Sequence, residues 1–173
     1  DLGISATGVA ERPAGALHTL RKPRLGLWDQ YGGSMPSGHV RWLLEQFEFD
    51  FEVVFPQSLD AGNLNARYDV LLFPDGGIPE NAGGGGFFGR QPKAEEIPEQ
   101  YRAHLGSVTI DKTIPQLKQF AEAGGVIVAF GGSAVLGHHL GLPIRDHLVE
   151  VTTAGGERAL PRDKYYVPGS ILR

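Results

Sequence analysis

The stretch Val126-Ile-Val-Ala-Phe-Gly-Gly-Ser133 decides the fold, because five apolar residues run directly into a glycine turn. A short apolar run closed by glycines is typical of a strand buried in a parallel sheet. Residues 134–140 follow as a short helix candidate, which Gly141 and Pro143 end. This part of the chain therefore predicts a strand, a tight turn and a helix.

Similar apolar runs precede this stretch, and each ends at a turn or a proline. They predict buried strands at Leu25–Trp28, Phe51–Phe55 and Val70–Phe73. Strands that alternate with helices imply right-handed crossovers. We therefore expect a flavodoxin-like, doubly wound parallel sheet with helices on both faces.

Two longer helices are predicted between these strands. The first has one apolar face and Ser37 or Gly38 as its N-cap, and the second has Thr113 as its N-cap. Gly124 and Gly125 end the second helix. Their apolar faces contain Val40, Leu43, Leu44 and Phe47 in the first, and Ile114, Leu117, Phe120 and Ala121 in the second.

The chain divides into a linker at residues 1–23 and one domain at residues 24–173. The domain contains a long insertion at 78–108, with a Gly83–Gly86 run and a charged short helix at 93–102. Residues 147–151 suit a strand, and residues 152–162 suit a hairpin or loop. Because Ile171 and Leu172 resemble the start of another strand, we expect a fragment whose parent continues with a strand and a helix.

Composition excludes several classes of function. The 173 residues contain no cysteine, which excludes disulfides, thiolate metal sites and a cysteine nucleophile. Sixteen basic and 20 acidic residues without long runs of one sign argue against a nucleic-acid partner. No apolar run approaches the roughly 20 residues that span a bilayer, so no membrane partner is expected either.

Ligands of open parallel sheets bind beyond the carboxyl ends of the strands. The candidate ligand-binding residues follow the predicted strands and are Asp29, Gln30, Tyr31, Gly76, Gly77, Gly131 and Gly132. Backbone N–H groups of such glycines can hold an anion. The glycines match no phosphate-binding motif, however, and tight turns are the favoured interpretation.

Ser133 is the one candidate nucleophile, since it lies where a strand turns sharply into a helix. In that alternative, His138 or His139 acts as its base, although adjacent helical residues point about 100° apart. A serine in this position is more often a helix cap, and we favour that interpretation of Ser133. The spacing of His147 and Glu150 occurs in zinc sites, but no third ligand accompanies them, and we interpret it as coincidence.

Three stretches resemble the carboxyl-terminal domain of large bacterial zinc carboxypeptidases of the carboxypeptidase A-like type. They are Arg24-Leu-Gly-Leu-Trp-Asp-Gln-Tyr-Gly-Gly-Ser-Met-Pro-Ser-Gly-His39 with its continuation to Phe49, Lys112-Thr-Ile-Pro-Gln-Leu-Lys-Gln-Phe120, and Tyr166-Val-Pro-Gly-Ser170. The resemblance covers most of residues 5–173. It implies a class I glutamine amidotransferase-like domain that follows a catalytic metallopeptidase domain.

That superfamily places a catalytic cysteine at the elbow after the strand that corresponds to residues 126–130. Alignment on Gly131 puts this position at Phe130, or at Ala129 with a shift of one residue, and neither can attack a carbonyl. The resemblance thus implies a degenerate elbow and a noncatalytic accessory domain, with a small-ligand binding module and a serine hydrolase as alternatives.

The resemblance also implies partners and a location. The expected partners are an upstream peptidase domain of the same polypeptide and a second copy in a homo-oligomer. No cofactor is expected in this chain, and the zinc ion of the parent belongs to the upstream domain. The location of the chain stays open, and a secreted or periplasmic parent is compatible with the resemblance. The parent is expected to hydrolyse C-terminal peptide bonds.

Overall fold

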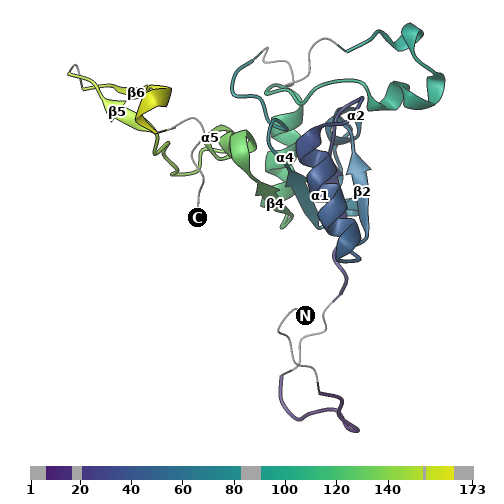
Figure 1. The fold of residues 1–173 in the computed structure, drawn as a ribbon. Helices are drawn as coiled ribbons and strands as arrows, with labels where there is room; N and C mark the ends of the chain where they lie inside the picture. Colours follow the sequence, from purple (N-terminus) through teal and green to yellow (C-terminus); the bar gives the residue numbers. More distant parts are fainter. Residues whose placement is uncertain (1–6, 17–20, 83–90, 154, 166–173) are drawn as a thin grey trace.

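A four-stranded parallel sheet forms the centre of the computed structural model, which describes residues 7–16, 21–82, 91–153 and 155–165 (Figure 1). The strands are β1 (Leu25–Trp28), β2 (Phe51–Val54), β3 (Val70–Phe73) and β4 (Val126–Ala129), in the order β2-β1-β3-β4. All three pairings are parallel. The predicted α/β class is confirmed, and the strand order is compatible with a flavodoxin-like fold.

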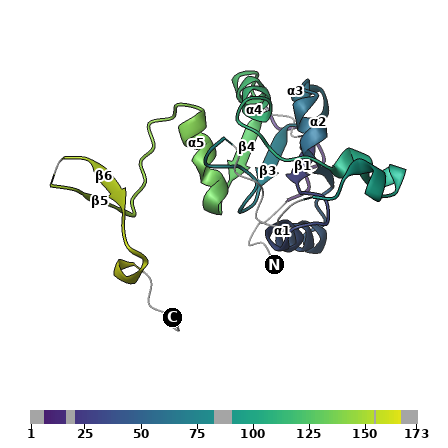
Figure 2. The same cartoon turned by 90° about the horizontal axis from the view of Figure 1, so that it is seen from above.

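Helices cover both faces of the sheet, as predicted. In the view from above, α1 lies alone on one face, while α2, α3 and α4 lie on the other (Figure 2). Their bounds are α1 Met35–Gln46, α2 Pro56–Asp60, α3 Leu64–Arg67 and α4 Thr113–Glu122. The two short helices α2 and α3 escaped the sequence analysis because four or five residues are too few to show a helical period.

The predicted N-caps of both longer helices are wrong. Helix α1 is capped by Ser34, whose Oγ accepts a hydrogen bond from the backbone N–H of Ser37 at 3.2 Å. Ser37 itself is buried and donates to the carbonyl of Trp28 at 2.7 Å, which ties α1 to β1. In α4 the cap position belongs to Lys112, and the Thr113 hydroxyl instead donates to Asp60 on α2.

The predicted insertion packs against α2. In its described residues two 3-10 helices, Ala94–Glu96 and Glu99–His104, take the place of the single short helix expected at 93–102. The Gln57 side-chain amide donates to the carbonyls of Arg102 and Leu105, both at 2.9 Å. The His104 ring stacks on Phe55 with centroids 3.8 Å apart. The Gly83–Gly86 run lies outside the described residues.

After β4 the chain forms a 3-10 turn (Gly131–Val135) and the short helix α5 (Leu136–His139), where one helix was predicted. The strands β5 (Val149–Val151) and β6 (Glu157–Ala159) then form an antiparallel hairpin, which confirms the strand and hairpin predicted at 147–162. A last 3-10 turn spans Arg162–Lys164.

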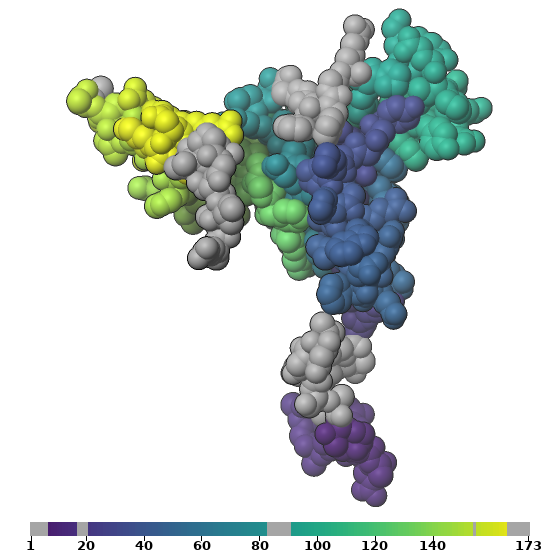
Figure 3. All heavy atoms as spheres, in the orientation of Figure 1, coloured from purple at the N-terminus to yellow at the C-terminus, as the bar shows by residue number. Residues whose placement is uncertain are grey.

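Two segments protrude from the body of the molecule. Figure 3 shows the hairpin in yellow on one side and the described N-terminal residues in purple below the sheet. Residues 7–16, within the predicted linker, are exposed and contain no helix or strand. The Tyr166–Ser170 stretch lies outside the described residues.

The hydrophobic core fills the space between the sheet and helices α2–α4. It includes Trp28, Leu71, Phe73, Leu117 and Phe120, each at most 4% exposed. The central strand β1 contributes Gly26 to this layer, where neighbouring side chains leave no room. A Cβ atom at Gly26 would lie 2.7 Å from a methyl carbon of Leu71 and 2.9 Å from one of Val54.

Two Gly→Ala substitutions test this packing. Gly26→Ala overfills the core, so we expect a loss of about 1–3 kcal/mol in the free energy of unfolding. Gly38→Ala is the matched control, because Gly38 lies in α1 with open space around its missing Cβ. This variant should gain about 0.5–1 kcal/mol. Urea denaturation of both variants measures the difference, and equal effects would contradict the described packing.

An ion pair joins the amino ends of β1 and β3. The Asp69 carboxylate accepts hydrogen bonds from the Arg24 side chain at 3.0 and 3.1 Å and from the Arg24 backbone N–H at 2.9 Å. The side-chain hydrogen bond with Arg24 is the main cause that holds the pKa of Asp69 well below its usual range. An acid with a lowered pKa stabilises the fold above its unfolded-state pKa of about 4 and loses this effect below it.

We therefore expect Asp69→Asn to lower the melting temperature at pH 7. The gap between wild type and variant should stay constant down to about pH 4 and narrow below it, as the wild-type carboxylate takes up its proton. Thermal unfolding of both proteins from pH 7 to pH 2 measures this gap. A gap that widens on acidification would contradict the assigned role of the Arg24–Asp69 pair.

Candidate functional site

The loops that follow β3 and β4 meet at one edge of the sheet. Asp75, two residues after β3, accepts a hydrogen bond from the backbone N–H of Gly132 at 2.5 Å. Gly131 has a φ of +62°, and a Cβ atom there would lie 2.7 Å from Asp75 Oδ1. The Asp75 carboxylate therefore fills the space over this turn. It also accepts the hydrogen bond of one of the turn's N–H groups, which is then not available to a ligand.

A nucleophile elbow presents its reactive side chain from the strained residue of the strand-to-helix turn. In this turn the left-handed residue is Gly131, which has no side chain. Phe130 has extended backbone angles, φ −140° and ψ 163°, and Ala129 is the last residue of β4. Neither of the two positions expected from the resemblance thus adopts the strained conformation of an elbow.

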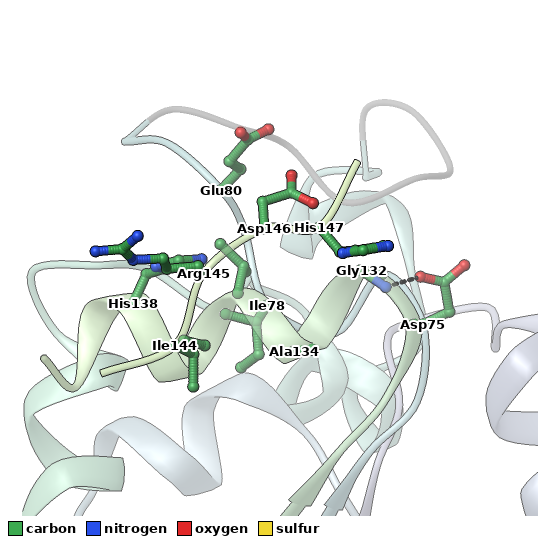
Figure 4. Close-up of a pocket in the computed structure, with 13 residues that line it drawn as sticks. Asp75, Ile78, Glu80, Gly132, Ala134, His138, Ile144, Arg145, Asp146 and His147 are labelled. Atoms are coloured by element: carbon green, nitrogen blue, oxygen red, sulfur yellow. Dashed lines mark hydrogen bonds between the residues drawn. The ribbon is translucent and has the colours of Figure 1, made fainter. Parts of the chain in front are cut away.

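A cavity of about 540 Å3 opens beside this turn (Figure 4). Apolar side chains of Ile78, Ala134 and Ile144 form its floor. Charged and imidazole groups surround it, with His138 and Arg145 at one end and His147 near Gly132 at the other. The remaining lining residues are Asp75, Gly76, Glu80, Gly131, Val135 and Asp146. Such a cavity suits a small ligand with both polar and apolar parts.

Ser133 is buried beneath this cavity and does not line it. Its Oγ donates to the carbonyl of Pro74 at 2.5 Å and accepts from the N–H groups of Gly77 at 2.8 Å and Ile78 at 3.2 Å. It makes no side-chain cap bond at the start of the 3-10 turn, so the cap interpretation is wrong. Through these three hydrogen bonds Ser133 attaches the loop after β3 to the turn after β4, which is a structural role.

The histidines face different surroundings. His138 lines the cavity, whereas the Nε2 atom of His139 lies 2.8 Å from the carbonyl oxygen of Pro79. The hydrogen bonds of Ser133 go to loop 74–78, so the geometry does not pair Ser133 with either ring as a base.

His147 and Glu150, whose spacing occurs in zinc sites, do not lie in one site. His147 lines the cavity, while Glu150 lies on β5 and pairs with Arg158 and Lys164. The hydrogen bond with Lys164 is the first cause that lowers the pKa of Glu150. Among the described residues, no group of three His, Asp or Glu side chains is placed to hold a metal ion.

Three of the seven predicted ligand-binding residues line this cavity, namely Gly76, Gly131 and Gly132. Gly77 lies below, where a Cβ atom would come within 3.0 Å of the Trp28 ring. Asp29, Gln30 and Tyr31 follow β1 and are absent from the cavity lining. Asp29 is half-buried and accepts from the Gln30 N–H at 2.8 Å, and burial is the main cause that raises its pKa.

Other lining residues were missed by the sequence analysis. Asp75 had a usable signal, because it directly follows Pro74 at the carboxyl end of a predicted strand. The 144–147 segment had none, since it reaches the cavity only through the return of the chain after α5.

Comparisons of this chain with protein-family models, curated proteins and solved structures gave no match. Of the helices in the described parts of the chain, none has the length and apolar character needed to cross a bilayer.

Replacement of Ser133 tests its structural role. Ser133→Ala leaves two buried N–H groups and a carbonyl without their partner, so we expect a loss of about 1–3 kcal/mol or more in the free energy of unfolding. Ser107→Ala, at an exposed position, is the matched control and should change stability by less than about 0.5 kcal/mol. Chemical denaturation compares the two, and a neutral Ser133→Ala would contradict the described bonds.

Proposed function

We propose that this chain is a noncatalytic, amidotransferase-like accessory domain of a zinc carboxypeptidase-like protein. The observation that carries the proposal is the position of Asp75 against Gly131 and Gly132. An acyl-transfer site needs a nucleophile and free N–H groups for the oxyanion. Here the strained residue has no side chain, and an internal carboxylate already holds the N–H of Gly132.

The flavodoxin-like assignment belongs to the same proposal. The order β2-β1-β3-β4 matches the first four strands of the flavodoxin-like order, whose ligands bind where the strand order reverses. The loops after β1 and β3 follow that point, and the described cavity opens between the β3 and β4 loops. The arrangement supports a domain that keeps the binding edge of this architecture without its chemistry.

Ligand capture is the role that the cavity supports best. An apolar floor with imidazole, guanidinium and carboxylate groups around it offers partners for a zwitterion such as an amino acid or a short peptide. In the parent, such a ligand would be a substrate or a product of the peptidase domain. The parent reaction would be metal-assisted hydrolysis of a C-terminal peptide bond in the domain upstream of Asp1.

The absence of catalysis can be tested with reactive probes. We expect no covalent labelling of this chain by a fluorophosphonate and no hydrolysis of an activated ester or of glutamine. The denatured chain serves as the control for nonspecific labelling. Labelling of Ser133 in the folded chain, identified by peptide mass, would contradict the proposal and support a serine hydrolase.

The link to a peptidase needs a separate experiment. We expect the coding sequence ahead of the Asp1 codon to encode a zinc carboxypeptidase domain. The longer polypeptide should retain about one zinc ion after dialysis and release C-terminal amino acids from peptides, while this chain alone should retain none. Tight, stoichiometric zinc binding by this chain would contradict the proposal that the zinc site belongs to the upstream domain.

A further inference from the structure

The cavity beside the β4 turn carries groups of opposite charge at its two ends. The Arg145 guanidinium lies at one end, next to the His138 ring, and the Asp75 carboxylate lies at the other, next to Gly132 (Figure 4). The apolar floor of the cavity lies between these two ends. A ligand that reaches both ends therefore needs an anionic group, an apolar middle and a cationic group in that order.

The Arg145 end suits a carboxylate. A guanidinium presents five N–H donors in a planar fork, which can hold both oxygens of a carboxylate with two parallel hydrogen bonds. The adjacent His138 ring adds a nitrogen atom to the same end of the cavity. This end is therefore the natural place for the carboxylate of an amino acid.

The Asp75 end suits a cation. Oδ1 of Asp75 accepts the hydrogen bond from the Gly132 N–H, which fixes the position of the carboxylate. An ionised carboxylate has about four acceptor sites on its two oxygens, so Asp75 can hold the turn and bind a ligand N–H group at the same time. Because the carboxylate is already ordered, a ligand cation does not bear the full cost of immobilising it.

The floor between the two ends suits a chain of methylene groups. Ile78 is only 5% exposed, and its backbone N–H donates to the buried Ser133 hydroxyl. Ile144 packs so closely on α5 that a Cβ atom at Gly137 would lie 2.3 Å from its Cδ1 atom. Lysine and arginine have apolar stems that lie along such surfaces while their charged ends reach polar groups.

The balance of charge favours a cationic ligand. Three carboxylates line the cavity, those of Asp75, Glu80 and Asp146, against the single guanidinium of Arg145. Glu80 and Asp146 lie above the floor, between the two ends (Figure 4). A site with this surplus of negative charge attracts cations and disfavours a ligand with a second carboxylate.

We propose that the ligand of this cavity is a free basic amino acid, lysine or arginine, with its α-carboxylate at Arg145 and its side-chain cation at Asp75. The α-ammonium group then faces Glu80 and Asp146. This inference rests on the ligand-capture role proposed above and narrows it to one class of ligand. A carboxypeptidase releases such an amino acid from a peptide that ends in lysine or arginine, so the parent enzyme would act on peptides of that class.

Isothermal titration of the complete chain with free amino acids tests the ligand class. Norleucine is the matched control for lysine, because it has the same carbon chain without the side-chain ammonium group. We expect lysine and arginine to bind about tenfold more tightly than norleucine, since each adds a charge-assisted hydrogen bond to Asp75. Glutamate should bind more weakly than norleucine, because its second carboxylate would approach that of Asp75.

Two variants test the orientation of the ligand. Asp75→Asn retains an oxygen for the Gly132 N–H but removes the charge, so it should weaken lysine about tenfold and leave norleucine unchanged. Arg145→Gln should weaken both ligands, because both carry the α-carboxylate. Asp111→Asn, at an exposed position outside the cavity, is the matched control and should change neither affinity. Circular dichroism checks that all three variants remain folded.

The possible failures are distinguishable. Norleucine that binds as tightly as lysine would overturn the preference for basic ligands and leave ligand capture itself standing. Lysine binding that neither Asp75→Asn nor Arg145→Gln weakens would overturn the assigned site. If none of the amino acids binds at millimolar concentration, this inference and the ligand-capture role are both wrong.

Discussion

The buried hydroxyl of Ser133 connects the two loops on which the candidate site depends. Ser133 lies in the first turn after β4. Its hydroxyl donates a hydrogen bond to the carbonyl of Pro74 and accepts hydrogen bonds from two N–H groups of the loop after β3. Asp75 follows Pro74 directly, so the same attachment brings its carboxylate to Gly132. The bonds of Ser133 thus join the two loops that contribute Asp75, Gly76, Ile78, Gly131 and Gly132 to the cavity.

Much of the fold could be predicted because its strands are short apolar runs that end at glycine or proline. The runs Val70–Phe73 and Val126–Ala129 both form strands of the parallel sheet, as predicted. The burial predicted for the second run is wrong in part, because Val126 is 53% exposed and Val128 is 42% exposed. The caps could not be predicted in the same way. Ser34 and Ser37 are equally good N-cap residues by type, and only the bond from Ser37 to the Trp28 carbonyl removes Ser37 from that role.

The candidate site was predicted only in part, for a related reason. Loop glycines 76, 131 and 132 were expected at the carboxyl edge of the sheet, and they line the cavity. Ser133 was considered only as a helix cap or a nucleophile, because its actual role depends on a long-range contact with residues 74–78 that no local pattern encodes. The approach of His147 depends on the path of the chain after α5, which has no periodic signal.

The β5–β6 hairpin has a consequence for how the molecule opens. A lone two-stranded hairpin is marginally stable in water, and this one is supported by the ion pairs of Glu150, in the middle of β5, with Arg158 and Lys164. Its six strand residues contribute nothing to the main hydrophobic core. We therefore expect the hairpin to open by local unfolding at a lower free energy than the parallel sheet and the Ser133 attachment.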